Sequence, residues 1–355
     1  MPLLETYGWT RFFADAFAAH AAAGLVPGRI AREHQHIYRV HTESGEHLAR
    51  VAGRLRHQAA GAHEFPAVGD WAAVRLLPQE HRAVIHAVLP RRSRFARHGA
   101  GGVTGQQVVA ANIDTIFLAQ GLDAEFNLRR IERYLVLAWE SGARPVIILN
   151  KADLCVDVAG YVREVEAVAA GVPIHVMSAR DGEGLDGIRV YLTAGETVAV
   201  LGSSGVGKST LINRLIGADR LPTAEVRASD SRGRHTTTTR ELILLPNGSL
   251  VIDTPGLREL QLWDAGSAIQ GAFADIDAVA AGCHYRDCSH EREPRCAVRA
   301  AVEAGQLAAA RLESYLKLRR ESAYLASRQD QAAQIASKRK WRAIHKAARD
   351  FKPRE

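Results

Sequence analysis

The stretch "ETVAVLGSSGVGKST", residues 196–210, decides the fold of this chain. Its apolar run ends at Gly202, the pattern G-x-x-x-x-G-K-[ST] extends to Ser209, and a helical run follows. In this pattern the backbone N–H groups turn toward phosphate oxygens, the lysine reaches the β- and γ-phosphates, and the hydroxyl binds Mg²⁺. We expect nucleotide contacts from Gly202, Ser203, Ser204, Gly205, Val206, Gly207, Lys208, Ser209 and Thr210, with Lys208 also catalytic and Ser209 also a Mg²⁺ ligand.

Apolar strands alternate with helical stretches on both sides of this loop. Three further runs, "DTIFLAQGLD", "RPVIILNKAD" and "VPIHVMSAR", also end in polar loops. This alternation is typical of a parallel sheet flanked by helices. Ligands of such sheets collect at the carboxyl ends of the strands, so these loops should meet at one edge.

A second phosphate-sensing element is "LVIDTPGL", residues 250–257. In a D-x-x-G arrangement Asp253 holds Mg²⁺ through water, and the Gly256 amide senses the γ-phosphate. The preceding "ELILLPNGSLVID" predicts a two-stranded hairpin that turns at Asn247-Gly248. A threonine of "SRGRHTTTTR" could supply another Mg²⁺ ligand. Spacing does not choose among Thr236, Thr237 and Thr238, and we keep Thr237 and Thr238 as candidates.

The base-reading loop is "ILNKADL", residues 148–154. Asp153 can accept hydrogen bonds from N1–H and N2–H₂ of guanine, a donor pair that adenine lacks, which disfavours an ATP-dependent enzyme. The stem of Lys151 can lie across the base, and Asn150 can tie this loop to the phosphate loop. We expect nucleotide contacts from Asn150, Lys151, Ala152 and Asp153, and from Ser178 and Ala179 of "MSAR".

The order of these loops is unusual, because the base loop precedes the phosphate loop. The order matches a GTPase sequence that has been cut and rejoined. A permuted chain can rebuild the same site because all the loops leave one edge of the sheet.

Four metal-type side chains crowd into "GCHYRDCSHEREPRCAV", where Cys283, Cys288, His290 and Cys296 have the spacing C-x4-C-x-H-x5-C. Three thiolates and one imidazole complete a tetrahedral zinc shell with no open position. The sequence predicts one structural Zn²⁺. Cys155 has no metal-type neighbours in sequence and is expected to be a packing residue.

The chain divides into four predicted segments. An Ala-rich helical extension, 1–26, precedes short β-type runs that fit a small barrel and end in the basic connector "RRSRFARHG", together 27–98. The GTPase domain covers 99–262, and a zinc-binding domain with a helical basic tail covers 263–355. Two interpretations of the connector remain open, a solvated linker and an RNA contact by Arg91, Arg92, Arg94 and Arg97.

The composition limits the expected location of the protein and the charge of its partners. The chain is 47% hydrophobic and 24% charged, and no run reaches the roughly 18 apolar residues of a membrane span. We expect a globular, cytoplasmic monomer without a membrane partner. The net charge of +7 favours a polyanionic partner. The tail, 338–355, holds eight Lys or Arg and Trp341, which fits either a solvated basic helix or an RNA contact.

The permuted order, "GSSGVGKST", "GRHTTT", "DTPG" followed by Leu257, and the Cys/His segment resemble the ribosome small-subunit-dependent GTPase family, RsgA or YjeQ. The resemblance covers about residues 27–320. It implies a multidomain α/β protein: a barrel of the oligonucleotide-binding type, a circularly permuted P-loop GTPase domain and a helical zinc domain. It also implies binding to the small ribosomal subunit and its rRNA late in maturation. "SAR" departs from the commoner SAK, which leaves the role of Arg180 open.

Two functions compete on this evidence. One is a GTPase that binds GTP and GDP, turns over slowly alone and is stimulated by the small subunit. The other is an RNA-binding scaffold for which GTP is mainly a structural or switch ligand. Leu257 stands where Ras-type GTPases have a water-orienting Gln, so slow unassisted turnover is expected. His235 of the threonine segment is the candidate that positions the water, as an alternative to a surface histidine.

Overall fold

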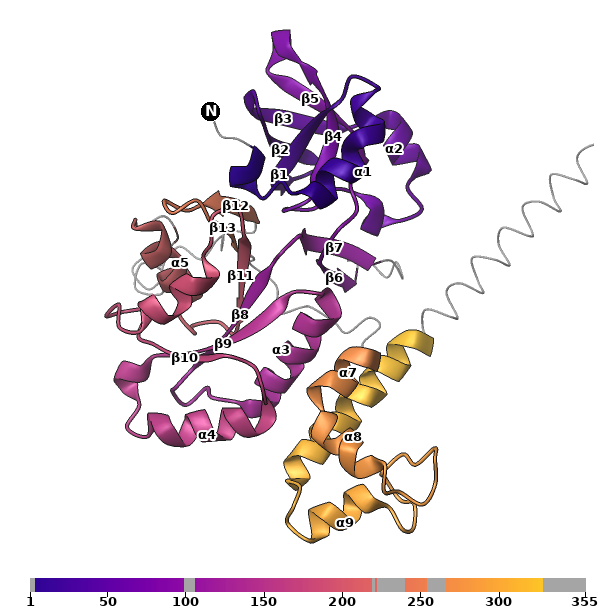
Figure 1. The fold of residues 1–355 in the computed structure, drawn as a ribbon, viewed down its shortest axis with the longest axis vertical. Helices are drawn as coiled ribbons and strands as arrows, with labels where there is room; N and C mark the ends of the chain where they lie inside the picture. The colour runs from indigo at the N-terminus through magenta and orange to yellow at the C-terminus, as the bar shows by residue number, and fades with distance from the viewer. Residues whose placement is uncertain (1–3, 99–105, 219–220, 222–239, 254–265, 328–355) are drawn as a thin grey trace, which may run out of the picture.

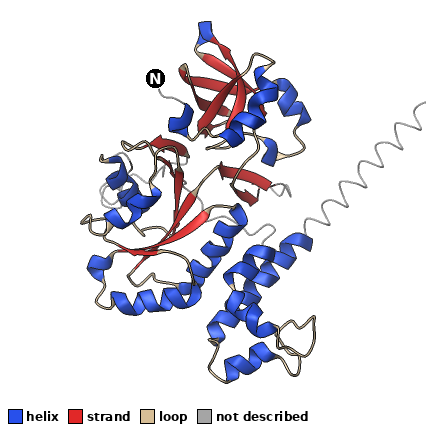
Figure 2. Cartoon of the chain, in the orientation of Figure 1, coloured by secondary structure: helices blue, strands red, loops and turns tan. Residues whose placement is uncertain are grey.

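The computed structural model describes residues 4–98, 106–218, 221, 240–253 and 266–327. Figure 1 shows an N-terminal barrel, a central α/β region and a C-terminal helical region. Strands occur in the first two regions, whereas the described residues 266–327 are helix and loop (Figure 2). The predicted segment boundaries at 98/99 and 262/263 fall at or within stretches outside the described residues.

Five strands close the barrel. They are β1 (Val26–His34), β2 (Ile37–Thr42), β3 (Gly45–Val51), β4 (Trp71–Leu77) and β5 (Arg82–Val88). They pair in the order β1-β2-β3-β5-β4, and a β1–β4 pairing closes the ring. Apolar side chains alternate inward, as Tyr38 and Val40 do in β2, and fill the interior. The predicted barrel is confirmed.

The N-terminal extension packs on this barrel. It forms η1 (Leu4–Tyr7) and α1 (Arg11–Ala21), the helix that the Ala-rich pattern predicts. Phe13 of α1 is buried, and the ring of Trp9 lies edge-on to that of Trp71, 4.6 Å between centroids. Three short helices complete the barrel: α2 (Gly53–Gln58), η2 (Ala62–Glu64) and η3 (Pro78–Glu80).

The basic connector is folded rather than a solvated linker. It leads into β6 (Arg94–His98), which pairs with β7 (Gln106–Ala111) between the barrel and α3 (Figure 1). Arg91 forms a bidentate ion pair with the fully buried Asp70, at 2.8 Å from Nε to Oδ1 and 2.7 Å from Nη2 to Oδ2. The linker interpretation is therefore wrong for Arg91, because a buried carboxylate needs a cation at this position.

The central sheet has the order β10-β9-β8-β11-β13-β12. Its strands are β8 (Thr115–Gly121), β9 (Arg144–Asn150), β10 (Ile174–Val176), β11 (Thr197–Gly202), β12 (Glu241–Leu244) and β13 (Leu250–Asp253). All neighbours are parallel except the β12–β13 pair. Helices α3 (Leu128–Ser141) and α4 (Val158–Val168) cover one face, and η5 (Leu185–Tyr191) and α5 (Lys208–Ile216) cover the other.

The predicted hairpin joins β12 to β13. Gly248 takes a left-handed φ of +84°, and the Leu245 N–H donates to the Ser249 carbonyl at 2.8 Å. Strand β12 also pairs with barrel strand β1 through Arg32 and Glu241, so the barrel and the central sheet are joined into one hydrogen-bonded array.

A buried arginine also joins the barrel to the central region. Arg29 of β1 is 1% exposed and donates from Nη2 to Thr197 Oγ1 at 3.0 Å and to the Asn112 carbonyl at 3.3 Å. Its guanidinium carbon lies 5.4 Å from the centre of the Trp71 ring, within cation–π range. Because Thr197 begins β11, this contact sits at the opposite end of the strand from the phosphate loop.

The C-terminal helices are joined to the central region through α7, which packs on α3. They are α7 (Gly266–Ala272), α8 (Ala274–Ala280), α9 (Ala297–Glu303) and a helix over 309–327. Arg311, 7% exposed, donates from Nη1 to Glu132 Oε1 of α3 at 2.7 Å and from Nε and Nη2 to Asp275 of α8 at 3.0 and 2.8 Å. Arg133 of α3 adds a bidentate pair with Glu321 at 2.6 and 2.8 Å.

Candidate functional site

The phosphate loop connects β11 to α5 at the carboxyl edge of the sheet. Gly207 caps α5 with a left-handed φ of +95°, and a Cβ there would lie 2.4 Å from Asn150 Nδ2. A Cβ at Gly202 would lie 2.6 Å from the Ala119 carbonyl oxygen. Both positions therefore require glycine. The loop leads into the positive end of α5, where unpaired N–H groups favour phosphate.

Lys208 points back into this loop. Its Nζ donates to the carbonyls of Gly202 at 2.9 Å and Ser203 at 2.6 Å. The ammonium group thus lies over the carbonyls that frame the loop, where a phosphate oxygen can replace one of them. Ser209 and Thr210 follow in the first turn of α5 and are half-buried.

Asn150 links three loops. Its Nδ2 donates to the Val206 carbonyl in the phosphate loop at 2.7 Å, and its Oδ1 accepts from the Ala179 N–H at 2.8 Å. The side chain is buried, so both contacts lie in a low-dielectric setting that strengthens them. The predicted tie between base loop and phosphate loop is confirmed, and it extends to the "MSAR" loop as well.

The remaining base-loop residues surround this link. Lys151 takes a left-handed φ of +67°, which turns the chain into η4 (Ala152–Leu154) and leaves Asp153 exposed. Ser178 and Ala179 are each 1% exposed, and Ser178 Oγ donates to Asp181 at 2.9 Å. The structure thus brings the two predicted base-contacting loops together.

The Mg²⁺ side of the site is described in part. Asp253 ends β13, beside the phosphate-loop strand β11, and is half-buried. Gly256, Leu257, His235, the threonines Thr236, Thr237 and Thr238, and the tail 338–355 lie outside the described residues.

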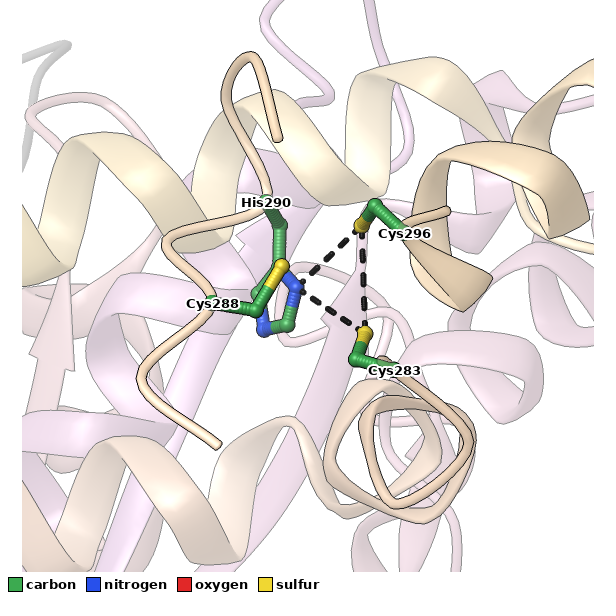
Figure 3. Close-up of side chains that lie close together, drawn as sticks. All are labelled: Cys283, Cys288, His290 and Cys296. Atoms are coloured by element: carbon green, nitrogen blue, oxygen red, sulfur yellow. Dashed lines mark hydrogen bonds between the residues drawn. The ribbon is translucent and has the colours of Figure 1, made fainter. Parts of the chain in front are cut away.

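The four predicted metal ligands meet in the C-terminal region (Figure 3). The sulfurs of Cys283, Cys288 and Cys296 and a ring nitrogen of His290 all lie within 4.8 Å of one another. His290 Nδ1 is 3.6 Å from Cys283 Sγ and 3.4 Å from Cys296 Sγ, and these two sulfurs are 3.9 Å apart. With Zn–S bonds of about 2.3 Å, a tetrahedron has edges of about 3.8 Å, so the four donors fit one zinc ion.

The neighbouring thiols help to raise the pKa of Cys288, and a bound cation would lower it. Burial, together with the neighbouring thiols of Cys296 and Cys283, raises the pKa of Cys288 to about 11. Burial also lowers the pKa of His290, which favours the neutral imidazole that binds metal. A divalent ion among these atoms would stabilise the thiolates directly.

Comparison with known proteins places this geometry in a family. The sequence profile of the RsgA GTPases matches residues 88–263. A protein named small ribosomal subunit biogenesis GTPase RsgA, from Opitutus terrae, is 48% identical over 355 residues, which cover 98% of this chain and 97% of that one. This chain belongs to the RsgA GTPase family. It is therefore a GTP hydrolase, as the paired base and phosphate loops predict.

Other relatives agree with this assignment. The protein named small ribosomal subunit biogenesis GTPase RsgA 2 from Lactiplantibacillus plantarum is 51% identical over 314 residues, 88% of each chain. The crystal structure of YjeQ from Thermotoga maritima aligns with a TM-score of 0.63 and 29% identity, over 84% of this chain and 99% of that one. A circularly permuted GTPase, YloQ, has a TM-score of 0.58 at 23% identity, over 86% of this chain and 96% of that one, and shares the fold.

Sequence patterns did not reveal two features of this RsgA-family GTPase. Asp123, after β8, pairs with Lys151 of the base loop, and Arg311 joins the C-terminal region to α3. The polar end of "DTIFLAQGLD" was a signal for the first, because that loop shares the carboxyl edge of the sheet.

Within the described part of the chain, no helix is long and apolar enough to cross a membrane.

Proposed function

We propose that this RsgA-family GTPase binds the small ribosomal subunit and its rRNA and hydrolyses GTP to GDP and phosphate during late maturation of that subunit. Turnover is slow alone and faster on the subunit. The observation that carries the nucleotide part is the double hydrogen bond of Asn150, which holds the base loop, the "MSAR" loop and the phosphate loop together. Asp153 then reads the guanine edge beside bound phosphates.

The residues of this site have different proposed roles. Lys208 and the phosphate-loop amides stabilise charge that develops on the transferring phosphoryl group. Ser209 and Asp253, with Thr237 or Thr238, would hold Mg²⁺, which supplies positive charge against the β- and γ-phosphates when bound. The Gly256 amide senses the γ-phosphate. Ser178 and Ala179 back the base.

Water positioning sets the unassisted rate in this proposal. Leu257 can neither donate nor accept a hydrogen bond, so it cannot orient the attacking water as a Gln would. In this proposal His235 orients that water when the GTPase is bound to the subunit. A neutral imidazole can accept a proton near physiological pH, which suits this role.

Charge on the barrel supports an RNA partner. Arg39, Arg50 and Arg82 are exposed on three neighbouring strands, and Leu48 pairs with both Arg39 and Arg82 across the strands. Arg39 pairs with Glu46 at 3.4 Å and Arg82 with Glu80 at 3.3 Å, but such exposed ion pairs are weak and a phosphate can replace the carboxylate. The net charge of +7 also favours a polyanion. The relatives from Opitutus terrae and Lactiplantibacillus plantarum carry the small subunit in their names.

The Cys283, Cys288, His290 and Cys296 cluster is proposed to hold one structural Zn²⁺. All four positions of a tetrahedral shell come from the protein, which leaves none for substrate. Elemental analysis should find one zinc per chain. Cys288→Ser should lose it, whereas Cys155→Ser should keep it, and zinc retained by the first variant would show that the ligand set is wrong.

GTP hydrolysis with purified small subunits tests the whole proposal. Small subunits should raise the turnover rate, whereas large subunits and bulk RNA should not. His235→Ala should lose most of the stimulation with GTP affinity nearly unchanged, and Asp153→Asn should shift preference toward xanthine nucleotides. Equal rates with and without small subunits would favour a scaffold for which GTP is a structural ligand.

A further inference from the structure

We infer that Asp123 is a positioning residue for guanine-nucleotide binding and acts by fixing Lys151 of the base loop. The inference rests on the proposed base-reading role of residues 150–153. Asp123 belongs to a different part of the sequence from that loop, and none of the nucleotide motifs contains it. Its place in the fold brings it to the same edge of the sheet.

The backbone fixes this arrangement. Strands β8 and β9 are parallel neighbours in which Gly121 is paired with Asn150, and the Leu122 N–H donates to the Asn150 carbonyl at 2.8 Å. The chain therefore reaches Asp123 directly beside the start of the base loop. The same Asn150 is bonded to the phosphate loop, so the two carboxyl-edge loops share one rigid anchor.

The side chains then meet. Lys151 Nζ lies 2.5 Å from Asp123 Oδ2, and Asp123 Oδ1 accepts from the Glu125 N–H at 3.1 Å. The side chains of Lys151 and Asp123 are 27% and 22% exposed, so the pair is shielded from much of the solvent. Both oxygens of the carboxylate are thus engaged, and its orientation is determined.

Two details indicate that the position is built for a carboxylate. A Cβ at Gly121 would lie 2.9 Å from Asp123 Oδ1, so the missing side chain at 121 leaves room for the carboxylate to fold back. Burial works to raise the pKa of Asp123, but the hydrogen bond and charge of Lys151 outweigh it and lower that pKa. Asp123 is therefore ionised at neutral pH.

This pairing matters because Lys151 acts through its stem. The methylenes are expected to lie across the base, while the ammonium group makes no reading contact with it. An unpaired Lys151 would sample many rotamers and would have to be ordered when the nucleotide binds. Asp123 holds the ammonium group beforehand, so the stem is already in place and less affinity is lost to ordering.

A double-mutant cycle in the full chain tests this. Asp123→Asn removes the charge at nearly constant volume, and Lys151→Met keeps an apolar stem without the ammonium group. Binding of a fluorescent GDP and a fluorescent GTP analogue is measured for wild type, both single variants and the double variant. KM and kcat for GTP are measured in parallel.

We expect Asp123→Asn to weaken GTP and GDP binding by about tenfold, and the same change in the Lys151→Met background to have little further effect. KM should rise with kcat nearly constant, because ground-state and transition-state binding are lost together. Asp123→Glu should recover much of the affinity. Glu125→Gln, a neighbouring exposed carboxylate on the same loop, should bind like wild type.

The outcomes separate this inference from the proposed site. Equal losses from Asp123→Asn in the wild-type and Lys151→Met backgrounds would overturn it, because Asp123 would then act independently of Lys151. Full affinity in Asp123→Asn, with binding weakened in Lys151→Met, would overturn it too. Unchanged binding in Lys151→Met, with no preference for GTP over ATP in wild type, would instead reject the base-reading site.

Discussion

Two buried arginines attach the outer regions to the GTPase domain, and they differ in the charge of the groups that surround them. Arg29 on the barrel side donates to the neutral oxygens of Thr197 and Asn112, and its guanidinium carbon lies 5.4 Å from the centre of the Trp71 ring. Arg311 on the C-terminal side is bonded to two carboxylates, those of Glu132 and Asp275. One attachment places a lone cation against neutral groups, and the other forms a buried ion network.

The pKa values of the two guanidinium groups show the difference. Burial lowers the pKa of Arg29 to about 10, and the more distant Asp114 and Asp70 offset this only in part. For Arg311, burial acts in the same direction, but the bonds to Asp275 and Glu132 outweigh it and raise its pKa. A buried charge is tolerated in either setting, but only the second depends on a matched set of opposite charges.

The sharpest test of this difference is Arg311→Met. Removing the cation leaves Glu132, which is 3% exposed, without its partner, and frees Asp275. Breaking a buried ion network in this way should lower the free energy of unfolding by about 3–5 kcal/mol. Urea unfolding measures the loss. The triple variant Arg311→Met, Glu132→Gln, Asp275→Asn is the matched control and should recover part of it.

Arg29→Met should lower the free energy of unfolding by less, about 1–2 kcal/mol. It leaves only the neutral acceptors of Thr197 and Asn112 without a donor, and it removes a charge whose burial is itself unfavourable. The same urea titration measures this loss. Should Arg29→Met prove as damaging as Arg311→Met, the neutral partners and the Trp71 contact would be worth as much as the carboxylates, and the contrast between the two attachments would fail.

Acid should loosen the C-terminal attachment before the barrel attachment. Arg311 lowers the pKa of Asp275 against the opposing effect of burial, so the folded value lies below the unfolded value of about 3.9. This contribution is therefore complete above pH 4 and is lost as the pH falls through the folded pKa. Hydrogen exchange at pH 3 and pH 6 should show greater acid-induced opening for residues 266–327 than for the barrel. Equal opening would argue against the carboxylate network.

The smallest loss of stability is expected at an exposed ion pair between α3 and the helix over 309–327. Arg129 lies 2.6 Å from Glu313, but the two side chains are 48% and 64% exposed. Solvent screens such a pair, so Arg129→Gln should change the unfolding free energy by less than about 0.5 kcal/mol. A larger loss would mean that the ion pairs on α3 act as one network with Arg311 rather than separately.

Local spacing accounts for what the sequence could predict. The phosphate loop, the base loop and the Cys/His cluster each lie within one short segment, so their residue types fix their chemistry before folding. The barrel and the hairpin at Asn247-Gly248 followed from strand patterns and turn residues. The site as a whole was predictable because parallel strands end at one edge of the sheet.

Contacts between distant segments account for the rest. Arg29 meets Thr197 across 168 positions, and Arg311 meets Glu132 across 179. Hydrophobic periodicity describes one segment at a time and therefore does not predict such pairs. The linker interpretation failed at Arg91 for a similar reason, because this side chain pairs with the buried Asp70, 21 positions earlier. A run of basic residues predicts a solvated surface only when none of its side chains pairs with a buried carboxylate elsewhere in the fold.

The pairing of β1 with β12 has a consequence for solubility. Without the barrel, β12 would be the edge strand of the central sheet, and an edge strand exposes unpaired N–H and C=O groups that can recruit another chain. Barrel strand β1 covers the beginning of that edge through the Arg32–Glu241 pair, and β10 at the opposite edge has only three residues. Because the barrel covers this part of β12, we expect a chain that lacks residues 1–90 to aggregate more readily than the whole protein.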